Sequence, residues 1–104
     1  MIQELQNRGL FELKRRWQSM FEVLRDGGEI SPASRLHTEG MMETLVLLEI
    51  SDRQDLQTEL ARRYEQCFGE SLAQRWGDDW AELFPFPQIP AFGQRAPVYP
   101  STND

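Results

Sequence analysis

The fold is decided by residues 31–68, which read SPASRLHTEGMMETLVLLEISDRQDLQTELARRYEQCF. Ser31 can cap a helix because its hydroxyl accepts a hydrogen bond from an unpaired first-turn amide. Pro32 suits the first helical position, where its missing N–H costs nothing. Ser51 begins a second capping pattern of the capping-box type, and Gly69 is the expected left-handed stop. The stretch therefore predicts two helices, over residues 32–50 and 52–68.

The first of these helices contains an apolar run, residues 41–50. A helix that is apolar on nearly all sides usually lies at the centre of its domain, so we expect this one to be buried. Gly40 costs about 1 kcal/mol relative to alanine in a helix interior, and close approach of another helix would account for it. Arg35 and Glu39 are one turn apart and can pair. A strand over residues 45–50 is the alternative, because short apolar runs fit either structure.

A further helix is predicted before this pair, over residues 10–26. Gly9 is expected to separate it from a loose first turn. Its apolar seam covers about two heptads, which is too short for an extended coiled coil and indicates core packing. The seam residues step by three and four, and Phe11 and Phe21 are expected to widen the stripe that they form: Leu10, Leu13, Trp17, Met20 and Leu24.

A fourth helix is predicted over residues 71–84, and Gly77 is the position where it could break. Trp76 and Trp80 share one helical face with Leu72. The structural interpretation is that they close the core, because tryptophan supplies a large buried area. The functional interpretation is an exposed aromatic patch that docks a partner.

The composition changes at residue 85, where a proline-rich segment begins. Repeated prolines predict an extended, polyproline-like tail over residues 85–104, attached to a helical domain of residues 1–84. A disordered linker rarely carries so many large apolar groups, so we expect the tail to pack on its own bundle or on another chain. The candidate partner-binding residues are Trp76, Trp80, Phe86, Ile89, Phe92 and Tyr99.

Length, charge and cysteine content set bounds on the class of protein. The chain has 104 residues, 27% charged and 39% hydrophobic, which is typical of a single globular domain. A single cysteine excludes an intrachain disulfide and suits a reducing compartment. The sequence predicts no signal peptide, and no stretch approaches the roughly 20 apolar residues of a membrane span. We therefore expect a cytoplasmic protein that does not enter a membrane.

The net charge of −6 argues against a broad basic surface of the kind on which nonspecific DNA binding depends. One basic cluster is present, Lys14, Arg15 and Arg16. It fits contact with phosphate or with an acidic partner, or a solvated helix face on which the arginines lie near Glu12. Three charges fall below the usual signal of a basic tract, which favours the solvated face.

No catalytic signature is visible in the sequence. His37 is the only histidine, so a nucleophile-histidine pair would have to combine it with Cys67 or a serine. A lone cysteine on an apolar helix face is usually an inert core residue. One histidine and one cysteine cannot form a structural zinc site in a single chain, and glycine-rich phosphate motifs are absent. We expect no catalytic residues, no bound metal and no cofactor; no residue pattern identifies a small ligand.

Together these patterns predict an all-α bundle of about four helices with an extended Pro-rich C-terminal tail. The leading functional prediction is a non-enzymatic protein-interaction or regulatory module. One alternative is a helix-turn-helix-like DNA-binding regulator, although Asp52 and Asp55 would repel phosphate at the start of its recognition helix. The other is an accessory subunit of an enzyme complex. A homodimer is expected, because three Trp and six Phe exceed what four short helices can hide.

Overall fold

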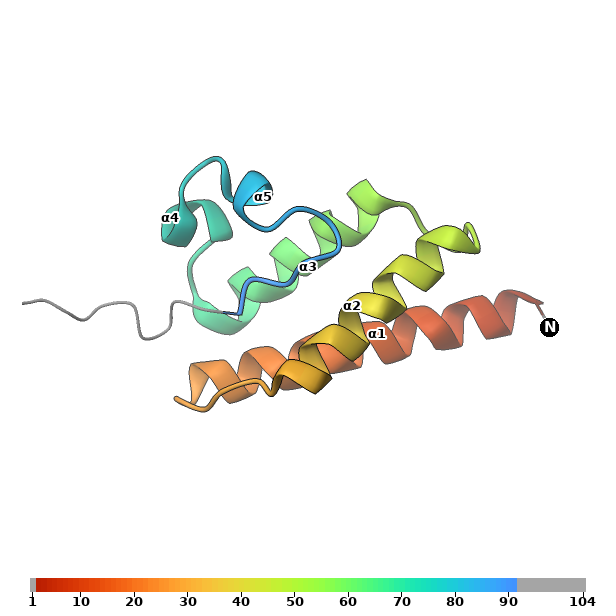
Figure 1. Ribbon diagram of the computed structural model, residues 1–104, viewed down its shortest axis with the longest axis horizontal. Helices are drawn as coiled ribbons and strands as arrows, with labels where there is room; N and C mark the ends of the chain where they lie inside the picture. Colours follow the sequence, from red (N-terminus) through yellow and green to blue (C-terminus); the bar gives the residue numbers. More distant parts are fainter. Residues whose placement is uncertain (1, 92–104) are drawn as a thin grey trace, which may run out of the picture.

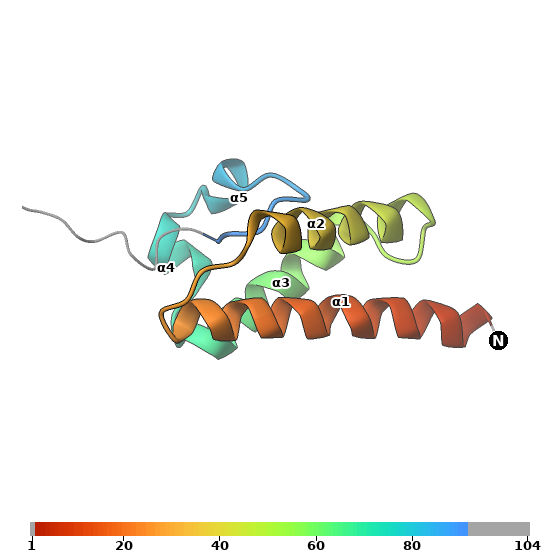
Figure 2. The ribbon, with the colours of Figure 1, turned by 60° about the horizontal axis from the view of Figure 1, so that its bottom comes forward.

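The computed structural model describes residues 2–91, which form five helices and contain no strand. The prediction of a small all-α bundle is confirmed, and the alternative of a strand over residues 45–50 is wrong. Figures 1 and 2 show α1 running along one side of the molecule, with α2 and α3 packed on it and the two short helices beyond α3. The helices are α1 (Ile2–Arg25), α2 (Pro32–Leu47), α3 (Arg53–Phe68), α4 (Leu72–Trp76) and α5 (Trp80–Leu83).

The first helix is longer than predicted, because it begins at Ile2 and passes through Gly9 without a break. A Cβ atom at Gly9 would lie 3.2 Å from Cδ2 of Leu45 in α2. The glycine therefore permits close packing of α1 against α2, and the prediction that it separates a loose first turn is wrong. The predicted seam is buried from Leu13 to Leu24, and Phe21 widens it as expected.

Local capping signals fix most of the helix ends. The Ser31 hydroxyl accepts the Ser34 amide hydrogen at 3.1 Å, with Pro32 in the first position, as predicted. At the end of α3, Gly69 adopts a φ of 77° and donates its amide hydrogen to the Glu65 carbonyl, which confirms the left-handed stop.

Two further predicted boundaries are wrong. The cap of α3 is Asp52 and not Ser51, since the Asp52 carboxylate accepts the Asp55 amide hydrogen at 2.8 Å. A capping box is instead formed before α4, where the side chains of Ser71 and Gln74 each accept the other's amide hydrogen. The second helix ends at Leu47, three residues before the predicted end at 50, and Glu49 then takes a left-handed φ of 59°.

The predicted helix over residues 71–84 is interrupted at Gly77, which has a φ of 100°. The break leaves α4 and α5 as two short turns on either side of it. The Trp76 and Phe84 rings pack edge to face across the break, with centroids 5.0 Å apart. Backbone that only glycine adopts easily thus allows two aromatic side chains to meet.

The centre of the bundle is α1, which packs against both α2 and α3. Its contact with α3 is rich in aromatic rings, and the Phe21 and Tyr64 rings meet edge to face at 5.4 Å. The expectation that the apolar helix α2 would be central is wrong. Among the residues that the structure describes, none has an atom within 4 Å of a Cβ placed on Gly40, so the close helix contact expected there is also wrong; that contact occurs at Gly9.

Candidate interaction surfaces

The first part of the predicted tail packs on the bundle. Ile89 is 1% exposed, and its amide hydrogen is donated to the Glu39 carboxylate of α2 at 3.0 Å. The same carboxylate oxygen accepts a hydrogen bond from Arg35 at 3.3 Å. Near the start of α3, the Arg53 guanidinium lies 5.6 Å from the centroid of the Phe86 ring. Residues 86–89 therefore connect α2 to the beginning of α3.

The predicted partner-binding residues do not gather into an exposed aromatic patch. Trp76, Trp80 and Phe86 are partly buried and pack against the core, and Ile89 belongs to the core itself. Phe92 and Tyr99 lie outside the described residues. The structure therefore places the described members of this set in the packing of the bundle, and exposed apolar groups occur elsewhere.

The side chains of the predicted basic cluster do not all point the same way. Arg15 and Arg16 both form ion pairs with Glu12, the first at 2.6 Å and the second at 3.1 Å. Hydrogen bonding from Arg15 lowers the pKa of the Glu12 carboxyl below its usual value. This pairing agrees with the solvated-face interpretation. Lys14 instead extends from α1 toward α3.

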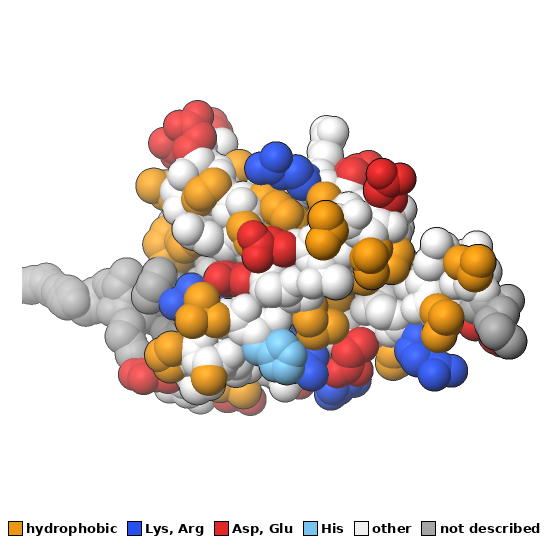
Figure 3. All heavy atoms as spheres, turned by 45° about the vertical axis from the view of Figure 1, so that its right-hand side comes forward, with side chains coloured by type: hydrophobic (Ala, Val, Ile, Leu, Met, Phe, Trp, Pro, Cys, Tyr) orange, Lys and Arg blue, Asp and Glu red, His pale blue; other side chains and the backbone are white. Residues whose placement is uncertain are grey.

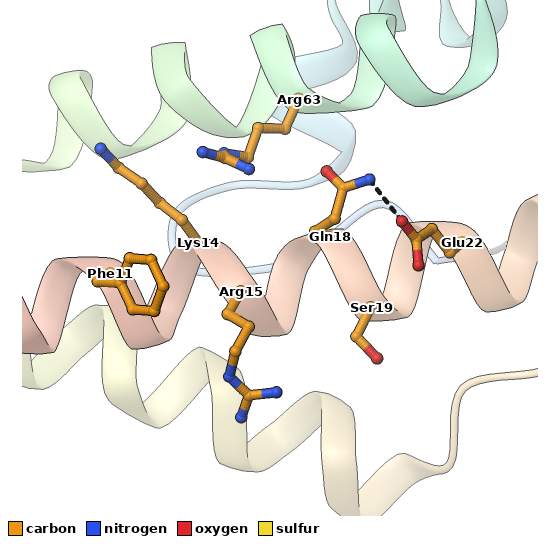
Figure 4. Close-up of a pocket in the computed structure, with 7 residues that line it drawn as sticks. All are labelled: Phe11, Lys14, Arg15, Gln18, Ser19, Glu22 and Arg63. Carbon is orange, nitrogen blue, oxygen red and sulfur yellow. Dashed lines mark hydrogen bonds between the residues drawn. The ribbon is translucent and has the colours of Figure 1, made fainter.

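A shallow hollow of about 310 Å³ lies on the surface formed by α1 and one arginine of α3. Figure 4 shows the Lys14 and Arg63 side chains on the α3 side of α1, and the Phe11 ring close to Lys14 and Arg15. Phe11 is 68% exposed, so the expectation that it widens the buried stripe is wrong. We call this site the cationic hollow, and its lining residues are Phe11, Lys14, Arg15, Gln18, Ser19, Glu22 and Arg63.

Sequence reasoning found part of this hollow and missed the rest. Lys14 and Arg15 were recognisable as a cluster because they are adjacent in the chain. Phe11 shares its apolar character with the seam residues, and its position on the opposite side of the helix was the available signal that it could be exposed. Arg63 had no local signal, because only the packing of α3 on α1 brings it to the hollow.

A second candidate surface lies on α2, where leucine side chains are exposed. Leu36 and Leu47 of α2 are 59% and 79% exposed, and Leu48, the C-cap residue that follows the helix, is 61% exposed. Gly40 lies between them in the chain and lines a shallow hollow of about 400 Å³ that also includes Gly9 of α1. Figure 3 shows hydrophobic side chains on the face that carries the histidine. We call Leu36, Gly40, Leu47 and Leu48 the α2 surface.

His37 and Cys67 are placed at separate positions along α1. His37 lines the same hollow as Gly9, whereas the Cys67 sulfur accepts a long hydrogen bond from Arg25 at 3.7 Å. Gly9 and Arg25 are roughly 24 Å apart along the helix axis. Burial raises the pKa of the Cys67 thiol, and this outweighs the opposing effect of Arg25. The thiol is therefore protonated near neutral pH, which makes it a weak nucleophile.

Within residues 2–91, no three His, Cys, Asp or Glu side chains are grouped in a way that could hold a metal ion. None of the helices in that range combines the length and the apolar character needed to cross a membrane. No protein-family model, curated protein or solved structure matches the chain. The two surfaces, one apolar and one cationic, are therefore the features of this chain that bear on its function.

Proposed function

We propose that the protein is a non-enzymatic interaction module that docks another polypeptide on the α2 surface. The observation that carries this proposal is the exposure of Leu36 and Leu47 of α2, together with Leu48, the C-cap residue that follows the helix. Contiguous apolar groups on a soluble domain commonly mark an interaction site. Each leucine that a partner covers would contribute roughly 1–2 kcal/mol, because more than half of each side chain is still open to water.

Gly40 gives this surface a shape that a partner side chain can fill. A glycine in a helix interior costs about 1 kcal/mol relative to alanine, and here no neighbouring atom within 4 Å requires it. The missing side chain leaves a depression beside Leu36, lined also by Met41 and Thr44. Anchor side chains of binding partners are typically buried in such pockets.

The partner can be a second copy of the chain or a different protein. A second copy would bury the same leucines on both protomers, and closed two-fold dimers are the commonest oligomers of soluble proteins. An enzyme chain that this protein assists would bind in the same way. Both arrangements require the α2 surface to be accessible to a partner.

The test replaces two leucines of the α2 surface by glutamate, Leu36→Glu together with Leu47→Glu. The matched control is Leu83→Glu, which places the same charge on an apolar side chain of α5 that is 52% exposed. Light scattering across micromolar concentrations reports self-association, and affinity capture with the full chain reports other partners. We expect the double variant to lose the complex by at least about tenfold in affinity, while its helical circular dichroism and the binding of the control are unchanged.

Two outcomes would overturn the proposal. One is a complex that survives the double substitution on α2. The other is that the wild-type chain stays monomeric and that every protein it captures is also captured by the double variant.

A further inference from the structure

The geometry points to a second binding site on this protein: we propose that the cationic hollow binds an acidic peptide segment with one large apolar side chain. This goes beyond the proposed function, because the hollow lies on α1 and α3 and shares no residue with the α2 surface. The proposal stands on three features, namely an excess of positive charge, unused hydrogen-bond donors and an exposed aromatic ring.

The positive charge arises because pairs of arginines share a single carboxylate. Arg15 and Arg16 both pair with Glu12, and the two arginines of α3, Arg62 and Arg63, both pair with Glu59. Each cluster therefore keeps a net positive charge. The surface around the hollow is consequently cationic on a chain whose net charge is −6.

Donor groups remain available for an incoming carboxylate. Arg63 donates through Nε to Glu59 at 3.0 Å, which leaves its two terminal nitrogens for a ligand. Lys14 forms no ion pair with the acidic side chains of residues 2–91, and its ammonium group carries three donors. Figure 4 shows the Lys14 side chain reaching from α1 toward α3 and the Arg63 side chain reaching from α3 into the space between the two helices. Hydrogen bonds from cationic groups to carboxylates are among the stronger ones in proteins.

Phe11 supplies the apolar contact. Its ring is largely exposed and lies beside Lys14 and Arg15 at one end of the hollow. The volume of about 310 Å³ is at the lower end for ligand sites, so it suits one large side chain better than a folded surface. An apolar group seated there would cover Phe11 and the aliphatic stems of the two basic residues.

Glu22 makes the two ends of the hollow different in charge. It lines the end opposite Phe11, and its carboxylate accepts a hydrogen bond from Gln18 at 2.9 Å. A ligand carboxylate near Glu22 would meet a like charge. The acidic groups of the peptide are therefore expected near Lys14 and Arg63, with the apolar side chain against Phe11.

A peptide fits this site better than a nucleic acid. Proteins that bind DNA through its backbone typically contact several phosphates along an extended basic surface. Here the hollow offers three cations, and the net charge of −6 would repel a long polyanion. A short acidic segment presents only a few charges and an apolar anchor, which match the few donors and the single ring.

The experiment measures binding of a fluorescent peptide, with one phenylalanine flanked by glutamates on both sides, to the full chain by anisotropy. Lys14→Glu is compared with Arg8→Glu, a matched control that alters charge at an exposed residue of the same helix outside the hollow. We expect Lys14→Glu to weaken binding by about tenfold or more and Phe11→Ala by about threefold to tenfold, with Arg8→Glu within about twofold. Raising the salt from roughly 50 mM to roughly 500 mM should weaken binding to the wild type.

The proposal is overturned if no saturable binding occurs, if Arg8→Glu weakens binding as much as Lys14→Glu, or if alanine replaces the peptide's phenylalanine without loss. It is also overturned if a short duplex DNA binds more tightly than the peptide. Circular dichroism shows whether each variant is folded. The double variant Leu36→Glu, Leu47→Glu should bind the peptide normally, so a failure at the hollow is distinguishable from a failure of the proposed function.

Discussion

The helices α2 and α3 have the same length of sixteen residues but opposite relations to the core. The helix with the long apolar run, α2, leaves Leu36 and Leu47 exposed. The more polar helix, α3, buries its two leucines, Leu56 and Leu60, together with Tyr64. The comparison shows that the number of apolar residues in a helix does not determine how deeply the helix is buried.

Spacing explains the difference. The buried residues of α3 recur every fourth position and form one face, which packs on α1 and also contacts α4. The apolar residues of α2 are distributed around the helix, and a neighbouring helix can cover only part of that circumference. The packing on α1 buries Met42 and Leu45, and none of the five helices within residues 2–91 covers Leu36 and Leu47 on the outer side. The unsatisfied apolar surface is what makes α2 a candidate docking site.

The largest expected effect tests this comparison directly with one substitution in each helix. Leu60→Ala in α3 should lower the free energy of unfolding by about 2–5 kcal/mol, because it opens a cavity in the core. Leu47→Ala in α2 should change it by no more than about 0.5 kcal/mol, because the side chain is already in water. Urea unfolding followed by circular dichroism measures both. Equal losses for the two variants would show that α2 is buried to the same extent as α3.

The next effect concerns the polar attachment of α2. Glu39→Leu removes the acceptor of the buried Ile89 amide and should cost about 1–3 kcal/mol. Glu39→Gln keeps an oxygen acceptor in nearly the same shape and should cost less. Thermal and urea unfolding of the two variants provide the comparison. If both variants were as stable as the wild type, the C-terminal segment would not be held to α2 by this hydrogen bond.

A pair of glycines sharpens the contrast between the open and covered sides of α2. Gly40→Ala should raise the free energy of unfolding by about 0.5–1 kcal/mol, because alanine favours the helix and the site is open. Gly9→Ala should raise the free energy of unfolding by less than this or lower it, because its new Cβ would lie 3.2 Å from Leu45. Differential scanning calorimetry can rank the two. If alanine stabilised the protein more at Gly9 than at Gly40, the close helix contact would lie at Gly40 and not at Gly9.

The smallest effect is the pH dependence of the polar side of α3. Burial by itself raises the pKa of Glu59, but hydrogen bonds from Arg62 and Arg63 hold it below its usual value. A carboxyl with a lowered folded pKa stabilises the protein above its unfolded pKa, near 4.5, and this contribution is lost as the pH falls through the folded value.

The matching measurement compares wild type with Glu59→Gln by urea unfolding at about pH 7 and about pH 3.5. The wild type should be more stable by roughly 0.5 kcal/mol at the higher pH, as is usual for ion pairs near the surface. This advantage should shrink at the lower pH. A constant difference would mean that Glu59 does not titrate differently in the folded and unfolded chains.

The helix type, the start of α2 and the end of α3 could be predicted because they depend on neighbouring residues. Ser31, Pro32 and Gly69 act within one turn of the chain, and their roles are confirmed. The choice between Ser51 and Asp52 as the cap of α3 could not be made, because both side chains can accept the same kind of hydrogen bond. The interruption at Gly77 was foreseen as a weak point, but the contact between the Trp76 and Phe84 rings across it was not predicted.

Only part of the cationic hollow could be predicted from the sequence. Adjacent positions in the chain revealed Lys14 and Arg15, and nothing in the local sequence linked them to Arg63 of α3. The predicted aromatic partner site was placed at Trp76 and Trp80, which pack against the core. An apolar residue carries the same sequence signal whether it is buried or exposed, so exposure depends on which neighbours are present.

The sequence alone predicts that the chain is helical, where α2 begins and α3 ends, and which face of α3 is apolar. These properties follow from hydrogen bonds and side-chain spacing within a few residues. Only the tertiary structure decided that α1 is central, that Gly9 rather than Gly40 lies at the helix contact, and that α2 keeps part of its apolar surface. The physical reason is that a helix buries only the side against which another element packs, and residues far apart in the chain decide which side that is.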